Sequence, residues 1–274
     1  MIRLLAFDLD GTILLNHNEI PRENLKVLEK ASAKGVYIVP TTGRIKTFIP
    51  TFISDLDFIK YAITANGGGA YNIRTDECLY EASISQSQAI EISKIIEKYN
   101  LYVEFYLDGN AHSLKQDVET AMSKHKMPES KRYFLSKKYF YYDNISEFLS
   151  NPKNNYQKIN LTYVPSNIRE EVIKEINKTA DLCVTSSICD NIEINHKNAT
   201  KALGINALCK HLGISKDEVM TIGDGSNDIS MLKWAGTSVA MGNAIDEAKA
   251  VSKYITDDCI NMGFAKAVEK FILG

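Results

Sequence analysis

The stretch LLAFDLDGTI, residues 4–13, ends an apolar run with two carboxylates one residue apart and then continues through Gly-Thr. In extended backbone, residues i and i+2 point to the same side, so Asp8 and Asp10 would crowd two negative charges together. A turn of the chain or a nearby cation would relieve this crowding. We therefore interpret the stretch as a buried strand that ends at a charged site.

Several other short apolar runs end at Asp, Thr, Gly or Asn. With the first, they cover residues 2–7, 37–39, 61–63, 219–222 and 237–241. Runs of this length read as buried strands, and residues 21–33 and 202–212 between them have helical spacing of apolar residues. Strands that alternate with helices predict an α/β fold with a parallel sheet. Because such sheets bind ligands at the carboxyl ends of their strands, the polar clusters should converge on one site.

The middle of the chain lacks these clusters. Residues 85–100 predict a helix with a capping box made by Ser85 and Gln88, residues 101–107 alternate like a strand, and residues 166–180 predict a second amphipathic helix. This pattern predicts an inserted α/β domain at 82–190, between two segments, 1–81 and 191–274, that together form the parallel-sheet core.

Composition excludes several classes of protein. The 274 residues are 45% hydrophobic and 24% charged with a formal net charge of -2, which fits a globular protein without a nucleic-acid or membrane surface. The five cysteines include no C-x-x-C pair, which argues against a disulfide framework or a zinc site. We expect no signal peptide and no membrane span, a cytoplasmic location, and a monomer or homodimer.

The carboxylates favour phosphoryl transfer. An aspartate beside a metal ion can attack phosphorus, and Asp8 fits that role. Asp10 could offer its backbone carbonyl to the same metal while its side chain acts as general acid and then as general base. A hard Mg²⁺ site needs further carboxylates, which GDGSND supplies as Asp224 and Asp228.

The negative charge of a bound phosphate needs donors. Thr42 with the Gly43 amide, the side-chain amide of Asn227 and the point charge of Lys201 could provide them. Lys201 is the candidate lysine because it opens the helix that leads toward the strand before Asp224.

Six motifs occur in a fixed order. They are DLDGT (8–12), TTGR (41–44), ANGGG (65–69), NATKALGINAL around Lys201, GDGSNDISML (223–232) and VAMGNA (239–244). In this order the chain resembles the haloacid dehalogenase-like phosphatases, specifically their Cof-type, class IIB sugar phosphatase branch. One departure is that Lys201 is followed by Ala-Leu-Gly, whereas the family usually places glycine directly after this lysine.

The resemblance implies a Rossmann-like core with an inserted α/β cap that selects the substrate. It implies an aspartyl-phosphate at Asp8 and Mg²⁺ held by Asp8, the Asp10 carbonyl and Asp224. It further implies a phosphate site made up of Leu9, Thr42, Gly43, Lys201 and Asn227. Asp228 would be a supporting carboxylate. The expected activity is hydrolysis of small phosphorylated metabolites, sugar phosphates foremost.

Some alternatives stay open. A phosphomutase would use the same intermediate, and a phosphate-ligand sensor would keep the pocket without turnover, although a sensor should have lost Asp8 or Asp10. Arg44 is either a substrate contact or a surface residue, and ANGGG is either a hinge or a plain glycine-rich turn. The sequence does not name the substrate.

Overall fold

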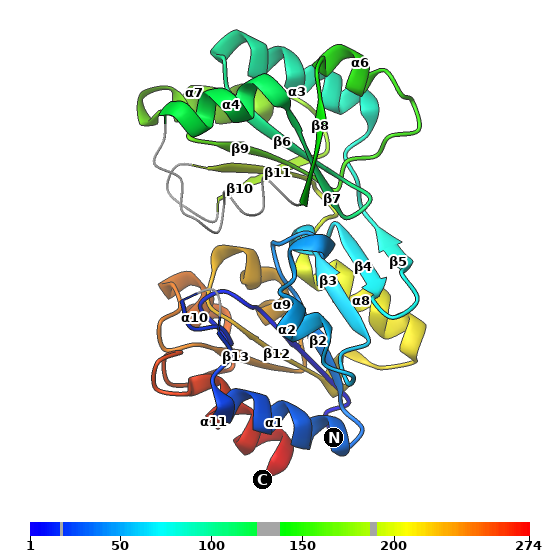
Figure 1. Ribbon diagram of the computed structural model, residues 1–274. Helices are drawn as coiled ribbons and strands as arrows, with labels where there is room; N and C mark the ends of the chain where they lie inside the picture. Colours follow the sequence, from blue (N-terminus) through cyan, green and yellow to red (C-terminus); the bar gives the residue numbers. More distant parts are fainter. Residues whose placement is uncertain (17–18, 125–137, 187–190) are drawn as a thin grey trace. The chain divides into compact units, whose positions relative to one another are not determined.

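The computed structural model describes residues 1–16, 19–124, 138–186 and 191–274 (Figure 1). These residues form two compact units. The first, here called the core unit, consists of Met1–Arg44, Ile49–Glu81 and Ala199–Gly274. The second, here called the inserted unit, consists of Ile45–Phe48 and Ala82–Asn198.

The core unit is built on a parallel sheet whose strands lie in the order β14-β13-β12-β1-β2. Their bounds are β1 Leu4–Phe7, β2 Tyr37–Pro40, β12 Val219–Gly223, β13 Thr237–Ala240 and β14 Tyr254–Ile255. In the centre, Phe7 pairs with Pro40 on one side and with Ile222 on the other. Every residue of β1 and β12 is buried, as expected for strands covered on both faces. The predicted parallel sheet is confirmed.

A small antiparallel sheet adjoins this parallel sheet. It consists of β3 Tyr61–Thr64, β4 Gly69–Asn72 and β5 Glu77–Glu81. An isolated parallel bridge between Thr41 and Ile63 connects the end of β2 to β3. The end of β3 therefore lies beside the end of β2.

Helices flank the core sheets. The longer ones are α1 Arg22–Ala33 and α8 Lys201–Leu212, and the shorter ones are α2 Thr51–Ser54, α9 Ile229–Trp234, α10 Asp246–Val251 and α11 Gly263–Val268. Short 3-10 turns occur at η2 Ala65–Gly67, η3 Lys216–Glu218 and η4 Ser226–Asp228, and α11 continues into a π turn, η5, at Glu269–Leu273. Thr200 caps α8 by accepting from the Leu203 amide, and the left-handed Gly213 ends it.

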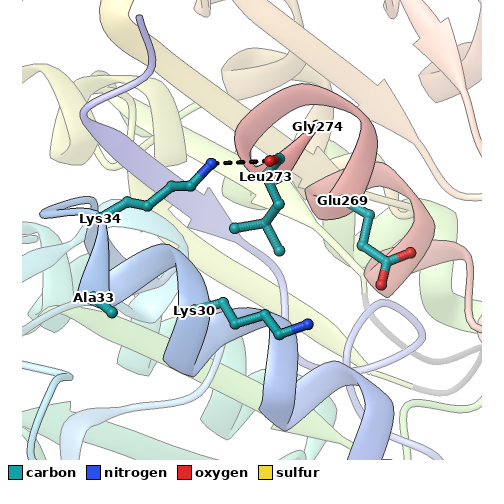
Figure 2. A pocket seen from close by; sticks show the side chains of 6 residues that line it. All are labelled: Lys30, Ala33, Lys34, Glu269, Leu273 and Gly274. Atoms are coloured by element: carbon teal, nitrogen blue, oxygen red, sulfur yellow. Dashed lines mark hydrogen bonds between the residues drawn. The ribbon is translucent and has the colours of Figure 1, made fainter.

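The C-terminal turn is tied to α1. Lys34 donates hydrogen bonds to the carbonyls of Ile272 and Leu273, at 3.1 and 2.9 Å. Figure 2 shows Lys34 and Leu273 at a hollow that is also lined by Lys30, Ala33, Glu269 and Gly274. The hollow lies at this helix contact, and none of the motif residues lines it.

The inserted unit contains a six-stranded sheet in the order β10-β11-β9-β6-β7-β8. The strands are β6 Tyr102–Leu107, β7 Asn110–Leu114, β8 Tyr139–Tyr142, β9 Lys158–Thr162, β10 Leu182–Thr185 and β11 Ile192–His196. Neighbouring strands are antiparallel except β7 and β8. The helices are α3 Gln86–Tyr99, α4 Lys115–Lys124, α6 Ile145–Leu149 and α7 Ser166–Ile176, with a 3-10 turn, η1, at Lys46–Phe48.

The two faces of this sheet differ in polarity. Val103, Phe105, Ile159 and Ile194 on one face belong to an apolar core that includes residues of α3 and α7. The opposite face is polar although its residues are buried. Glu104 accepts hydrogen bonds from the Tyr106 hydroxyl at 2.7 Å and from the Asn160 amide at 3.0 Å. Lys158 and Glu193 form an ion pair at 3.1 Å with both side chains under 10% exposed.

Two sequence expectations differ in detail from these elements. The helix predicted at 166–180 ends at Ile176. Residues 191–198, which the predicted boundary at 190 assigns to the core, belong to the inserted unit because β11 pairs with β9 and β10. The alternation of Ile192 and Ile194 with Glu193 and Asn195 is typical of a strand that has one apolar and one polar face.

The capping box predicted for residues 85–100 is present, since Ser85 and Gln88 exchange hydrogen bonds at the start of α3. Across the described ranges, no helix combines the length and the apolar character that a membrane crossing requires.

Candidate active site

Asp8 and Asp10 diverge at the end of β1. The Asp8 amide donates to the carbonyl of Ile222 at 3.0 Å, which holds Asp8 against the end of β12. Its side chain contacts Lys201, whereas the Asp10 side chain contacts Arg44. The chain turns at Gly11, whose φ of 82° is accessible at low cost only to glycine. Asp8 and Asp10 therefore contact different cations, and this relieves the crowding between them that an extended strand would impose.

Lys201 lies at the centre of the site. It is the first residue of α8 and is fully buried, with its Nζ 2.5 Å from Asp8 Oδ1 and 2.5 Å from Asp228 Oδ1. Burial alone would lower the pKa of Lys201, but the carboxylates of Asp228 and Asp8 outweigh burial and raise it. A lysine in this position stays protonated and holds Asp8 by charge.

Asp224 and Asp228 follow β12. Asp224 Oδ1 accepts from the Thr12 hydroxyl at 2.7 Å. Asp228 Oδ2 accepts from the amides of Asp224 and Gly225, both at 2.8 Å, so it fixes the loop that carries Asp224. One carboxylate oxygen from each of Asp8, Asp224 and Asp228 lies within 4.8 Å of the others.

The charges of this cluster do not balance. Three carboxylates lie around one ammonium group. Burial raises the pKa of Asp8 well above its usual range; the Lys201 ammonium opposes the shift, and the charges of Asp228 and Asp224 add to it. Burial likewise raises the pKa of Asp224 to about 6, although the hydrogen bond from Thr12 opposes it. A cluster of oxygen ligands in which carboxylates outnumber cations fits a hard divalent cation such as Mg²⁺.

Gly11 permits the turn after β1 to lie close to Asp224. A Cβ at this position would lie 2.4 Å from Asp224 Oδ2. The Gly11 carbonyl also accepts from the Asn243 side-chain amide at 2.8 Å, which links VAMGNA to DLDGT. Both motifs therefore fix the same turn.

The predicted phosphate-binding residues Thr42, Gly43 and Asn227 lie on two loops. The Thr42 amide donates to the Ile63 carbonyl at 2.9 Å, and its hydroxyl accepts from the Arg44 amide at 3.1 Å. A Cβ on Gly43 would lie 3.5 Å from Asn227 Nδ2, so the two loops meet at this glycine. Asn227 is also next to Asp228 in the chain, which connects these residues to the Lys201 cluster.

Leu9 can contribute only through its main chain. Its side chain is fully buried in the apolar core, and its carbonyl accepts from the amides of Ile13 and Leu14. The group of Leu9 that could bind a phosphate oxygen is therefore its amide.

The displaced glycine after Lys201 has a packing role. A Cβ on Gly204 would lie 2.8 Å from Ile63 Cγ2 and 3.5 Å from the Gly67 Cα. Glycine at 204 therefore lets α8 approach β3 closely while Lys201 keeps its contacts with Asp8 and Asp228.

Sequence reasoning missed the roles of Thr12, Asn66 and Asn243. Thr12 and Asn243 lie inside quoted motifs, but their contacts depend on which loops are neighbours. Asn66 accepts from the Asn227 amide at 3.0 Å. The dipeptide Asn66-Gly67 was a usable signal, because asparagine and glycine favour the left-handed backbone of a tight turn.

Comparison with known proteins identifies the family. The chain matches the haloacid dehalogenase-like hydrolase family over residues 5–268. It belongs to that family. The match contains all six motifs, from DLDGT to VAMGNA, so the family predicted from them is confirmed.

Relatives of this haloacid dehalogenase-like chain include two proteins of Bacillus subtilis. The 5-amino-6-(5-phospho-D-ribitylamino)uracil phosphatase YcsE is 31% identical, over 99% of this chain and 96% of its own length. The putative phosphatase YxeH is 29% identical, over 100% of this chain and 99% of its own length. Among solved structures, the class IIB sugar phosphatase BT4131 superposes with a TM-score of 0.82 at 27% identity and covers 98% of both chains.

Proposed function

We propose that this chain is a Mg²⁺-dependent phosphomonoester hydrolase that acts through an aspartyl-phosphate on Asp8. The observation that carries the proposal is the buried contact between Lys201 and Asp8, with Asp224 in the same cluster. This arrangement orients the Asp8 carboxylate beside an ammonium group and next to oxygen ligands that fit a divalent cation.

Asp8, Asp224 and the Asp10 main-chain carbonyl are the groups that would hold Mg²⁺. When bound, the ion would neutralise charge on the phosphate oxygens. Asp228 has a different role because both of its carboxylate oxygens accept hydrogen bonds, one from Lys201 and the other from two loop amides. We assign Asp228 to positioning Lys201 and the Asp224 loop.

The reaction follows from the two carboxylates. An Asp8 oxygen attacks phosphorus, the bond from phosphorus to the leaving oxygen breaks, and Asp10 gives that oxygen a proton. Asp10 then takes a proton from a water molecule, which attacks the aspartyl-phosphate. The bond between phosphorus and Asp8 breaks, and inorganic phosphate leaves.

Donors for the phosphate are the second part of the proposal. The Leu9 amide, Thr42, Gly43 and Asn227 would bind its oxygens together with Lys201. An ammonium group has three N–H donors, and two of those on Lys201 point at Asp8 and Asp228. The third would then serve a phosphate oxygen.

We further propose small phosphorylated metabolites as substrates, sugar phosphates foremost. YcsE is named for a phosphorylated ribitylamino-uracil and BT4131 for sugar phosphates, and both names describe a phosphate on a chain of hydroxyl groups. The inserted unit would select among such compounds. The polar face of its sheet, with Glu104, Lys158, Asn160 and Glu193, offers donors and acceptors that suit hydroxyl and amide groups.

A phosphate-release screen tests the proposal. The purified protein with Mg²⁺ is offered hexose and pentose phosphates, nucleotides, flavin and pyridoxal phosphates, and 5-amino-6-(5-phospho-D-ribitylamino)uracil. We expect phosphate release from at least one polyhydroxylated compound and none with the Asp8→Asn variant. Isomerised sugar phosphate without free phosphate would indicate a mutase instead. Binding without turnover across the panel would indicate a sensor.

A further inference from the structure

The turn after β3 has an unusual backbone. Ala65, Asn66 and Gly67 have φ values of 50°, 60° and 98°, so three consecutive residues lie in the left-handed region. Glycine adopts it readily and asparagine tolerates it, but for alanine it is unfavourable. Such residues are energetically costly and concentrate where the surrounding structure uses the conformation. A plain surface turn would not need two of them to be fully or nearly buried, as Ala65 and Asn66 are.

Gly67 brings this turn against the start of α8. A Cβ on Gly67 would lie 2.1 Å from the Thr200 carbonyl oxygen and 2.9 Å from the Lys201 amide nitrogen. Only a glycine allows this approach. The turn therefore packs on the residues that place Lys201.

The same turn is bonded to the Thr42–Gly43 loop. The Asn66 amide donates to the Thr42 carbonyl at 3.1 Å, and the Ala65 amide donates to the Arg44 carbonyl at 2.8 Å. A Cβ on Gly43 would lie 2.7 Å from Asn66 Oδ1. The Asn66 side chain thus lies directly against the glycine whose amide is a proposed phosphate ligand.

Asn66 also fixes the side chain of Asn227. Asn66 Oδ1 accepts one N–H of the Asn227 amide at 3.0 Å, and Asn66 is only 4% exposed. An amide nitrogen carries two N–H groups in one plane, so holding one sets the direction of the other. A flipped Asn227 amide would place two oxygens together at this distance, which disfavours the flip.

We propose that Asn66 is a positioning residue that orients the Asn227 carboxamide for binding a phosphoryl group. The inference rests on the proposed function, because it gives Asn227 its role as a phosphate donor. The left-handed turn sets Asn66 between Gly43 and Asn227, and its packing on Thr200 ties this arrangement to the helix of Lys201.

A double-mutant cycle tests this assignment on the Mg²⁺-loaded, full-length protein. Inorganic phosphate is the probe, and its dissociation constant is measured by titration calorimetry and as a competitive inhibition constant. The variants are Asn66→Gly, Asn227→Ala and both together. Glycine adopts the left-handed conformation without strain, so Asn66→Gly removes the side-chain carboxamide and still allows the backbone of the turn to form.

We expect Asn66→Gly to weaken phosphate binding by about fivefold to tenfold, the size of one hydrogen bond's net contribution. In the Asn227→Ala background the same change should have less than about a twofold effect, because coupled residues are not additive. Asn100→Gly is the matched control, since Asn100 is also left-handed, with a φ of 49°, and ends α3 in the inserted unit. It should leave phosphate binding unchanged.

Several outcomes would overturn the proposal. Unchanged phosphate affinity in Asn66→Gly would show that Asn66 does not position a phosphate ligand. If the affinity loss of the double variant equals the product of the two single losses, Asn66 does not act through Asn227. A fall in melting temperature far beyond that of Asn100→Gly, or failure to fold, would mean that Asn66 serves the fold itself. Equal phosphate affinity of the wild type and the Asn227→Ala variant would instead refute the proposed phosphate site.

Discussion

Arg44 holds the Asp10 carboxylate with two hydrogen bonds, one from Nε to Oδ2 at 2.8 Å and one from Nη2 to Oδ1 at 2.6 Å. A guanidinium fork that matches a carboxylate in this way fixes both the position and the plane of the acid. The arginine of TTGR, for which a substrate contact and a surface role were both open, therefore contacts the carboxylate proposed as the general acid and base.

Replacing Arg44 by lysine tests whether this fork matters. Lysine keeps the charge but not the bidentate geometry, so Asp10 should lose its fixed orientation. Because a general acid or base contributes about 10²–10⁴-fold, we expect kcat to fall by about tenfold to a hundredfold with KM changed less than about threefold. The measurement is steady-state kinetics on an alkyl phosphate, whose leaving group needs the proton.

Arg3→Lys serves as the matched control, because Arg3 forms an exposed ion pair with Glu218 at 3.6 Å. It should behave as wild type. Equal kinetics for Arg44→Lys and Arg3→Lys would show that the Asp10 fork has no part in turnover.

Substituting the two carboxylates of DLDGT should affect turnover in different ways. Asp8→Asn should lose essentially all turnover, because an amide oxygen is a poor nucleophile. Asp10→Asn should slow turnover by about 10²–10⁴-fold and, with an activated aryl phosphate, accumulate a phosphoryl adduct on Asp8. Peptide mapping of an acid-stable, hydroxylamine-sensitive adduct provides the readout. An adduct on another residue, or near-native turnover of Asp8→Asn, would contradict these roles.

Removing divalent cations should stop the reaction and weaken the fold. Chelation should abolish phosphate release, and Mg²⁺ should restore it. Since a ligand of the folded state stabilises it by about 2.7 kcal/mol at 100 times its dissociation constant, Mg²⁺ should also raise the melting temperature. Asp224→Asn should lose most of that rise. Full activity in excess chelator after dialysis, or an equal rise with NaCl of matched ionic strength, would exclude the metal site.

Gly11→Ala should damage the site through contact as well as strain. Its φ of 82° disfavours alanine, and the new Cβ would lie 2.4 Å from Asp224 Oδ2. Gly35→Ala isolates the strain, because Gly35 has a φ of 83° and no atom within 4 Å of its added Cβ. Both variants should lose about 1 kcal/mol or more of unfolding free energy in urea, but only Gly11→Ala should also lose Mg²⁺ binding and activity. Equal activity of the two variants would argue against this contact.

Much of the core fold could be predicted from local patterns in the sequence. Apolar runs that end in polar residues predicted β1, β2, β3, β12 and β13, and parallel strands bring such ends to one edge of a sheet. That rule predicted the meeting of Asp8 with Asp224. The lysine was also predictable, because Lys201 begins a helix at the same edge.

The remaining contacts depend on tertiary neighbours. Asn66 meets Asn227 only because the bridge between Thr41 and Ile63 sets β3 beside β2, and no pattern in residues 61–72 specifies that pairing. The strands β4 and β5 were not predicted, since their mixed sequence has neither a continuous apolar run nor strict alternation. The exit from the inserted unit lies beyond the predicted boundary at 190, because β11 follows that boundary and pairs with β9 and β10 of the inserted sheet.

The insertion between β5 and α8 has a consequence for the nascent chain during translation. Lys201 and Asp8 are 193 residues apart, and β12, which pairs with β1, is made later still. The inserted unit is made almost entirely from the one stretch Ala82–Asn198, so it can form its contacts while β1 still lacks one of its two neighbours. Until β12 leaves the ribosome, β1 presents an unpaired apolar edge. Chaperone dependence should therefore end with the synthesis of β12 rather than with that of the inserted unit.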